Sequence, residues 1–136
     1  MIRIKTILAT MAAVSSLALT SCEDLFENGS LQPDGSKPSI TVNNPSNNQT
    51  VTATNGLRVN ITAVDKDQFK GIDFVVKAGA GEKPLVNFTK FADKAVLEFD
   101  TLLTSSNFMP GSYTLIVTAT DKRTNVTVQE VKFNVK

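Results

Sequence analysis

Residues 110–121 read Pro110-Gly111-Ser112-Tyr113-Thr114-Leu115-Ile116-Val117-Thr118-Ala119-Thr120-Asp121, and this stretch decides the fold class of the chain. From Tyr113 onward, every second side chain is apolar, and threonine occupies most of the positions between. A period of two is that of a β-strand with one face on a core, and β-branched residues favour the same conformation. Pro110 and Gly111 are typical of a turn. The stretch therefore predicts a turn followed by a long, half-buried strand.

Similar runs recur on both sides of this strand, separated by clusters of Asn, Gly, Asp and Pro, and no stretch has a helical period. The predicted strands lie near Ile40–Val42, Leu57–Ala63, Ile72–Val76, Leu85–Phe91, Ala95–Phe99, Tyr113–Thr120 and Val126–Val135. About seven short strands are typical of an immunoglobulin-like sandwich. We therefore predict an all-β chain with a single immunoglobulin-like β-sandwich over residues 39–136.

The last predicted strand departs from the period. Its apolar residues are Val126 and Val128, followed by Val131, Phe133 and Val135. The step from 128 to 131 changes the face on which apolar side chains fall. This break predicts a β-bulge near Gln129 and Glu130.

The residues that open and nearly close this domain resemble those of bacterial Ig-like modules, of the immunoglobulin or fibronectin III-like kind, in surface lipoproteins. The matching segments are Pro38–Val42 and Pro110–Asp121, and the resemblance covers most of residues 38–136. It implies that Tyr113 forms a tyrosine corner at the start of the penultimate strand. The chain has no tryptophan and one cysteine, which excludes disulfide-bonded immunoglobulin domains. The resemblance marks a fold and no activity.

The N-terminus predicts export and lipid attachment. Arg3 and Lys5 precede an apolar run, Ile7–Leu19, which is shorter than the roughly 20 residues of a spanning helix. Leu19, Thr20, Ser21 and Cys22 follow as a lipobox. Residues 1–21 are therefore predicted to be a cleaved lipoprotein signal peptide, and Cys22 to carry the lipid that anchors the protein to a membrane. The alternative is an ordinary secretory signal with a chance cysteine.

The residues that follow the cysteine predict a cellular location and a flexible tether. Glu23, Asp24 and Glu27 resemble the acidic export signal of Bacteroidetes-type surface lipoproteins, which implies an outer-membrane protein facing the cell exterior. The alternative is a solvated acidic start to a linker. Asn28–Pro38 is rich in Gly, Pro, Ser and Asp, so we predict a flexible tether over residues 22–38.

Composition excludes several classes of function. The net charge of +1 would become −1 on loss of Arg3 and Lys5, so no basic patch for nucleic acid is expected. The chain has no histidine, its single thiol is assigned to the lipid, and no nucleophile elbow is present. We therefore expect neither an enzyme nor a cofactor.

Two predicted loops carry a weak calcium candidate. Asp65 and Asp67 follow one core strand and Asp121 ends another, and in this topology the two loops meet at one end of the sandwich. Clustered carboxylates are what Ca²⁺ requires. The favoured interpretation is turn chemistry, because three basic residues in the same loops would oppose a cation: Lys66, Lys122 and Arg123.

The opposite end carries a candidate contact for another protein. Leu102–Gly111 holds more apolar side chains than a free loop usually shows, among them Phe108 and Met109. The alternative is that the loop folds back and caps the core. Because the termini of such a sandwich lie at opposite ends, the Asp65 and Asp121 loops are expected on the tethered side.

Two functions stay open at this stage. The first is a non-catalytic interaction or adhesion module at the cell surface, whose partner is another cell-envelope or extracellular protein. The second is a small glycan-binding accessory lipoprotein of an outer-membrane polysaccharide uptake system. Exposed rings would favour glycan binding, but at least two of Phe88, Phe91 and Phe108 are expected in the core.

Asp100-Thr101-Leu102 resembles a bacterial O-glycosylation signal. Glycosylation of Thr101 and a chance occurrence of the motif are both left open.

Overall fold

The computed structural model describes residues 33–136 of the 136-residue chain. The predictions for Leu19, Thr20, Ser21 and Cys22, and for the acidic residues that follow, lie outside the described residues. Within the described part, no helix has the length and hydropathy needed to cross a membrane.

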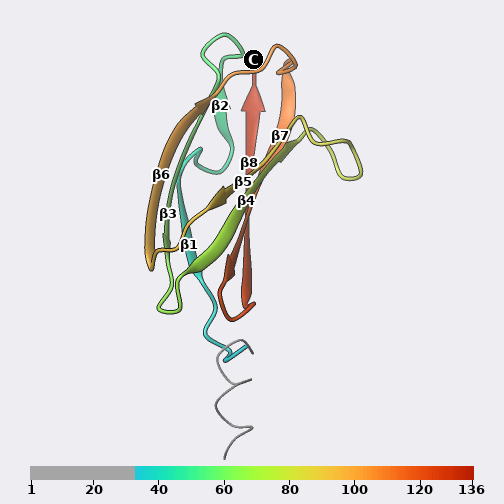
Figure 1. Ribbon diagram of the computed structural model, residues 1–136. Helices are drawn as coiled ribbons and strands as arrows, with labels where there is room; N and C mark the ends of the chain where they lie inside the picture. Colours follow the sequence, from blue (N-terminus) through green and yellow to red (C-terminus); the bar gives the residue numbers. More distant parts are fainter. Residues whose placement is uncertain (1–32) are drawn as a thin grey trace, which may run out of the picture. The chain divides into compact units, whose positions relative to one another are not determined.

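Eight strands make up the described part (Figure 1). In chain order they are β1 (Ser39–Asn44), β2 (Gln49–Val51), β3 (Leu57–Val64), β4 (Phe69–Lys77), β5 (Val86–Phe91), β6 (Val96–Leu103), β7 (Gly111–Asp121) and β8 (Val126–Val135). Seven of these match the predicted strands. The additional strand, β2, is too short to show a period, and it forms by pairing in parallel with β8.

The strands form two sheets, which face each other in the view of Figure 1. One sheet has the order β1-β3-β6, and the other has the order β2-β8-β7-β4-β5. The predicted alternation holds, because the odd-numbered side chains of β3 and β7 and the even-numbered side chains Ile72, Phe74 and Val76 of β4 are buried. Their burial between the two sheets forms one core. The prediction of a single all-β sandwich is confirmed.

The predicted bulge in the last strand is wrong. β8 pairs with β7 in an unbroken register from Thr120 opposite Val126 to Gly111 opposite Val135. Val126 and Val128 are instead exposed on the outer face of the sheet, whereas Val131, Phe133 and Val135 are buried. The change of face in the apolar pattern comes from two outward-facing valines and needs no extra residue.

The last residues of the predicted tether are attached to the sandwich. Pro38 is buried, and its carbonyl accepts a hydrogen bond of 2.7 Å from Oγ1 of Thr127. Asp34 binds side chains of two loops of the domain. Residues 33–136 form one compact unit that contains all of the described core, which is what a domain needs in order to fold alone.

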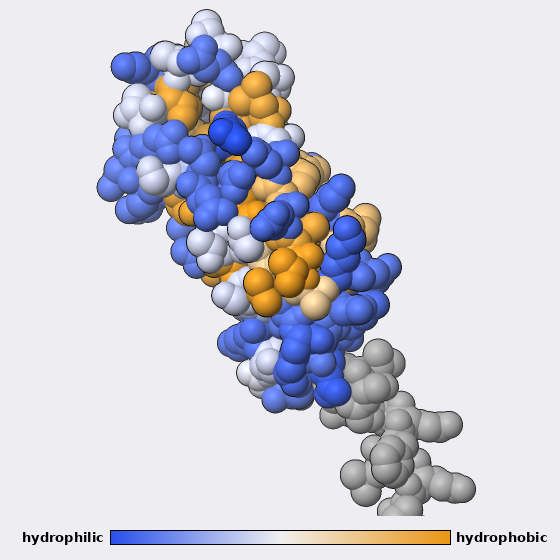
Figure 2. Space-filling model, turned by 90° about the vertical axis from the view of Figure 1, so that its left-hand side faces the viewer, coloured by the Kyte–Doolittle hydropathy of each residue, from blue (hydrophilic) through white to orange (hydrophobic). Residues whose placement is uncertain are grey.

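The outer face of the smaller sheet, β1-β3-β6, is mostly hydrophilic. Figure 2 shows the side that lies on the left in Figure 1, where hydrophilic side chains surround small, separate apolar patches. The exposed apolar residues include Val64 and Val96, which are paired neighbours on β3 and β6. Scattered exposed apolar side chains of this kind are normal on a protein surface.

Candidate functional site

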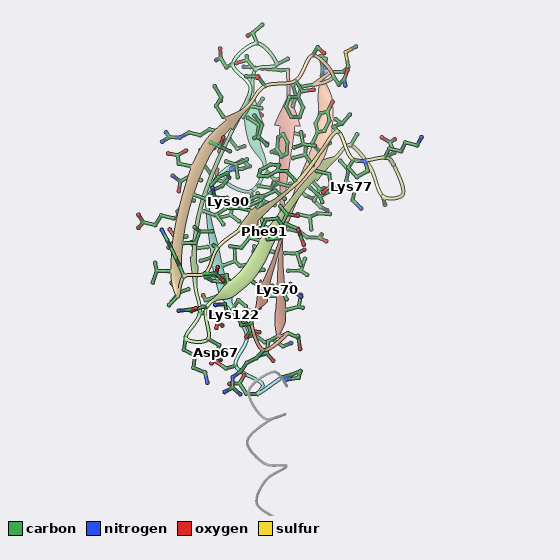
Figure 3. All side chains as sticks on the ribbon, in the orientation of Figure 1. Asp67, Lys70, Lys77, Lys90, Phe91 and Lys122 are labelled. Carbon is green, nitrogen blue, oxygen red and sulfur yellow. The ribbon has the colours of Figure 1, made fainter. Side chains whose placement is uncertain are left out.

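The two loops that carry the calcium candidates meet at one end of the sandwich, as predicted. The main-chain N–H of Lys122 donates to the carbonyl of Gln68 at 3.0 Å, and Nζ of Lys122 donates to Oε1 of Gln68 at 2.8 Å. These bonds join the β3–β4 loop to the β7–β8 loop. Figure 3 labels Asp67 and Lys122 at this end.

The carboxylates that come together here are not quite the predicted set. Asp34, Asp67 and Asp121 each place an oxygen within 4.8 Å of the others. Asp65 is buried, and its Oδ1 accepts the main-chain N–H of Asp67 at 2.7 Å, which is the turn chemistry expected of it. Asp34 was missed because a Gly- and Pro-rich segment has no periodic pattern that would attach it to a particular loop.

Each member of this acidic cluster already has partners. Oδ2 of Asp34 lies 2.7 Å from Nζ of Lys66, and Oδ1 of Asp67 lies 3.2 Å from Nε of Arg123. Asp121 accepts two hydrogen bonds of 2.8 Å from Asn125, one from the main chain and one from the side chain. Within the described residues these contacts explain the cluster as a set of turns and ion pairs that holds the loops together.

Two carboxyl groups at this end of the sandwich, Asp34 of the cluster and the neighbouring Asp65, have pKa values shifted in opposite directions. The hydrogen bond from Lys66 holds the pKa of Asp34 well below its usual range. Burial raises the pKa of Asp65, because the charged form loses water. The ammonium group of Lys66 and the guanidinium of Arg123 already neutralise the carboxylates of Asp34 and Asp67. The geometry therefore favours turn chemistry over calcium.

At the other end, the predicted contact residues have different environments. Phe108 is only 5% exposed and packs edge-to-face on Tyr113, with ring centroids 5.8 Å apart. Its burial corrects the prediction of a partner contact at Phe108 and matches the alternative, a loop that caps the core. Met109 is 66% exposed, so a contact at this residue stays a prediction.

Tyr113 organises this loop. Its hydroxyl donates a hydrogen bond of 2.6 Å to the carbonyl of Met109, four residues upstream, and its ring stacks on Phe133. This is the arrangement of a tyrosine corner. The role inferred from the Pro-Gly-x-Tyr motif is therefore present, and the buried ring is not available to stack on a sugar.

Of the three phenylalanines that were candidates for sugar stacking, one is exposed. Phe88 stacks on Phe74 at 4.8 Å, and Phe108 is buried, so the expectation of two core rings is confirmed. Phe91 is 78% exposed. Thr101 is half-buried on the same face of β6 as the buried Leu97, and its glycosylation stays a prediction.

Comparison with solved structures shows a likeness in fold. The structure is similar to that reported as the fibronectin(III)-like modules of Clostridium thermocellum CbhA, with a TM-score of 0.50 and 23% sequence identity. The match covers 74% of this chain and 47% of that chain, so this chain spans about half the length of the structure it matches. The fold is a fibronectin III-like sandwich.

The likeness shows the fold and goes no further. No family model matches the sequence, and no curated protein matches it. The fibronectin III-like sandwich places the Asp34 cluster at one end and the Met109 loop at the other, and it leaves Phe91 on the outer face of the larger sheet.

Proposed function

We propose that this protein is a non-catalytic, lipid-anchored lipoprotein of the outer membrane that displays its fibronectin III-like sandwich at the cell exterior as a protein-interaction or adhesion module. The partner we propose is another cell-envelope or extracellular protein. The anchor is the lipid on Cys22, and the acidic residues Glu23, Asp24 and Glu27 act as the signal for export to the cell surface.

The observation that carries this proposal is that the chain joins the sandwich at one of its two ends (Figure 1). The chain enters at the end where Asp34 binds Lys66 and Asn125. The exposed apolar side chains Leu102 and Met109 lie at the other end, near the C-terminus. Val64, Val96 and Val126 are exposed apolar side chains at the attached end. Leu102 and Met109 are instead at the end away from the attachment, which is the end that can be presented to a partner.

The chemistry of the described residues supports a role without catalysis. The chain has no histidine, and its one thiol lies at the proposed lipidation position. Asp100, which shares a face of β6 with Glu98, is held in a 2.6 Å ion pair by Arg58. The described acidic groups therefore serve mainly in ion pairs and turns.

Mass spectrometry of the membrane fraction tests the anchor. We expect a mature N-terminal peptide that begins at an acylated Cys22, and we expect Cys22→Ser to abolish acylation and processing. Recovery of a native N-terminal peptide that contains unmodified Cys22 would reject both the lipid anchor and the proposed location at the outer membrane.

Crosslinking on intact cells tests the contact. Met109→Ser and Leu102→Ser should each reduce capture of the partner at least tenfold, because both remove exposed apolar surface and leave the core intact. Val96→Ser, on the outer face of β6, is the matched control and should have no effect. Phe108→Ser is unsuitable, because it would open the core. Equal capture by wild type and both end variants would exclude this surface.

The glycan-binding alternative, an accessory lipoprotein of an outer-membrane polysaccharide uptake system, is favoured by one observation. The ring of Phe91 is the most exposed of the large apolar side chains in the described part.

A further inference from the structure

The outer face of the larger sheet has a gap at Gly71. In the sheet register, Gly71 of β4 lies between Phe91 of β5 and Thr120 of β7. The side chains of Phe91 and Thr120 point outward, whereas Gly71 between them has no side chain. Because neighbouring strands lie about 4.8 Å apart, the backbones of Phe91 and Thr120 are about 10 Å apart across this gap.

The local backbone does not require a glycine here. Gly71 is not in the left-handed region that favours glycine, and a methyl group on it would lie 3.4 Å from Cγ2 of Thr89 and 3.7 Å from Cδ1 of Phe91. These are ordinary contacts. Glycine within a strand weakens it and often marks a bulge or a site that a ligand approaches closely. The register with β7 also shifts between Phe69 and Gly71, and such irregularities redirect side chains near binding sites.

The gap is the floor of a notch of about 260 Å³. Phe91 forms one wall and Thr120 the opposite wall, and Lys70, Asp73 and Thr89 complete the lining. Figure 3 shows Lys70 and Phe91 near each other on the part of the sheet formed by β4 and β5. The notch therefore combines one exposed aromatic ring with a glycine floor and four polar side chains.

The polar side chains of the notch have free bonding capacity. Oδ1 of Asp73 accepts a hydrogen bond from Oγ1 of Thr89. Within residues 33–136, neither Asp73 nor Lys70 takes part in an ion pair. Oδ2 of Asp73 can accept a further hydrogen bond, Lys70 can donate, and the hydroxyl of Thr120 can do either.

We infer that this notch binds a single pyranose ring of a neutral glycan. The C–H face of the sugar packs on Phe91, and the glycine floor gives the ring room to enter. Its hydroxyl groups bond with Asp73, Lys70 and Thr120. An apolar ligand would leave the carboxylate of Asp73 without hydrogen bonds from solvent, which is costly. The lining carries one positive and one negative side chain, Lys70 and Asp73, so the notch has no net charge, which fits a neutral sugar. Sites that combine aromatic walls with a few placed polar groups are typical of small-ligand binding.

The expected affinity is low, because the notch is shallow and has only one ring. A dissociation constant of about 1 mM corresponds to about −4 kcal/mol, which a single stacked ring with a few hydrogen bonds can supply. The inference concerns the domain alone, so it depends neither on the lipid anchor nor on the Met109 contact.

Nuclear magnetic resonance titration of ¹⁵N-labelled residues 33–136 tests the inference. The probes are neutral oligosaccharides of glucose, mannose, galactose and xylose, each added separately. For at least one of them we expect saturable shifts confined to the amides of Gly71, Asp73, Thr89 and Thr120 and their neighbours.

Three variants separate stacking from other effects. Phe91→Ala should weaken binding at least tenfold, whereas Phe91→Trp should retain or strengthen it, because a larger ring gives the sugar more area. Gly71→Val should abolish binding without unfolding the sheet, since valine favours strands and its extra carbons fill the notch. Val96→Ala, on the other sheet, is the control and should bind as wild type does.

Several results would overturn the inference. One is the absence of shifts with all four sugars. Another is equal sugar affinity in wild type and Phe91→Ala; if that variant were also less stable, the ring would serve only to cover Gly71 as a cross-strand partner. Capture of a protein at the notch without any sugar shift would reassign the notch and reject a glycan. Met109→Ser should leave sugar binding unchanged, so failure here is distinguishable from failure of the end contact.

Discussion

Tyr113 connects the core to the loop that forms the exposed end of the domain. Its ring lies between Phe108 and Phe133, and its hydroxyl bonds to the carbonyl of Met109. Packing by the ring and bonding by the hydroxyl can be separated by mutation, because phenylalanine keeps the ring and lacks only the oxygen.

We predict that Tyr113→Phe lowers the free energy of unfolding by about 1 kcal/mol, the net contribution of one hydrogen bond. Urea denaturation measures the change. Met109→Ser keeps the main-chain carbonyl and is expected to have a much smaller effect. A Tyr113→Phe domain as stable as wild type would show that the corner does not depend on its hydrogen bond.

The ionisation of Asp34 makes the stability of the folded domain depend on pH. Its pKa is lower in the folded protein than in the unfolded chain, where it is about 3.9. Its stabilisation is therefore fully present above about pH 4 and is lost as the pH falls toward the lowered folded pKa. We predict that Asp34→Asn is less stable than wild type at neutral pH and that the difference disappears in strong acid. Denaturation curves over a series of pH values measure this, and a constant difference would contradict it.

Asp65 should behave in the opposite way. Its pKa is raised by burial, so the ionised form costs stability as the pH rises above the unfolded value of about 3.9. Asparagine keeps an oxygen for the N–H of Asp67 and removes the charge. We predict that Asp65→Asn is at least as stable as wild type at neutral pH, measured in the same pH series. A loss of stability at neutral pH would show that the charge itself is needed.

At the scale of the element, β8 shows how an apolar pattern can mislead. Val128 is 52% exposed and Val131 is 7% exposed, although both are valines of the same strand. The pairing with β7 determines which face each side chain occupies. The outward valines Val126 and Val128 lie beside Thr120 and Thr118 of β7, on the same outer face as Gly71.

This pair of valines gives a matched test of the register. Val131→Ala should lower the free energy of unfolding by about 2 kcal/mol, because it removes two buried methyl groups and leaves a cavity. Val128→Ala should change it by less than about 0.5 kcal/mol, as is usual for exposed positions. Equal losses would indicate that the strand is shifted and that a bulge is present after all.

At the scale of the whole molecule, the boundary of the domain lies before the first strand. Pro38 is buried and bonded to Thr127, and Asp34 binds Lys66 and Asn125. The chain is thus held for several residues before β1, at the end where the two acidic loops meet. This attachment makes residues 34–38 part of the domain.

We predict that residues 39–136 fold into the same two sheets as residues 33–136 but are less stable. Loss of the Thr127 hydrogen bond alone accounts for about 1 kcal/mol, and loss of the Asp34 contacts adds to it. Calorimetry of the two fragments measures the difference. Identical unfolding temperatures would move the boundary to Ser39, as the sequence predicts.

Local patterns in the sequence were sufficient for the strands, because a strand with one face on a core needs alternating side chains wherever it lies. This is why β3, β4 and β7 were predicted with the correct buried faces, and why the Pro-Gly-x-Tyr motif identified the tyrosine corner. The two loops that carry Asp65 and Asp121 could also be brought together, because the topology of a sandwich determines its ends.

Tertiary structure alone decided the details of each surface. Phe108 and Met109 are adjacent and both apolar, yet only Phe108 reaches the core. Asp34 joins Asp67 and Asp121 although it lies outside every strand, and Phe91 faces Gly71 only through the register of β4 and β5. Local preferences extend over a few residues, whereas these contacts depend on how distant segments pair and pack.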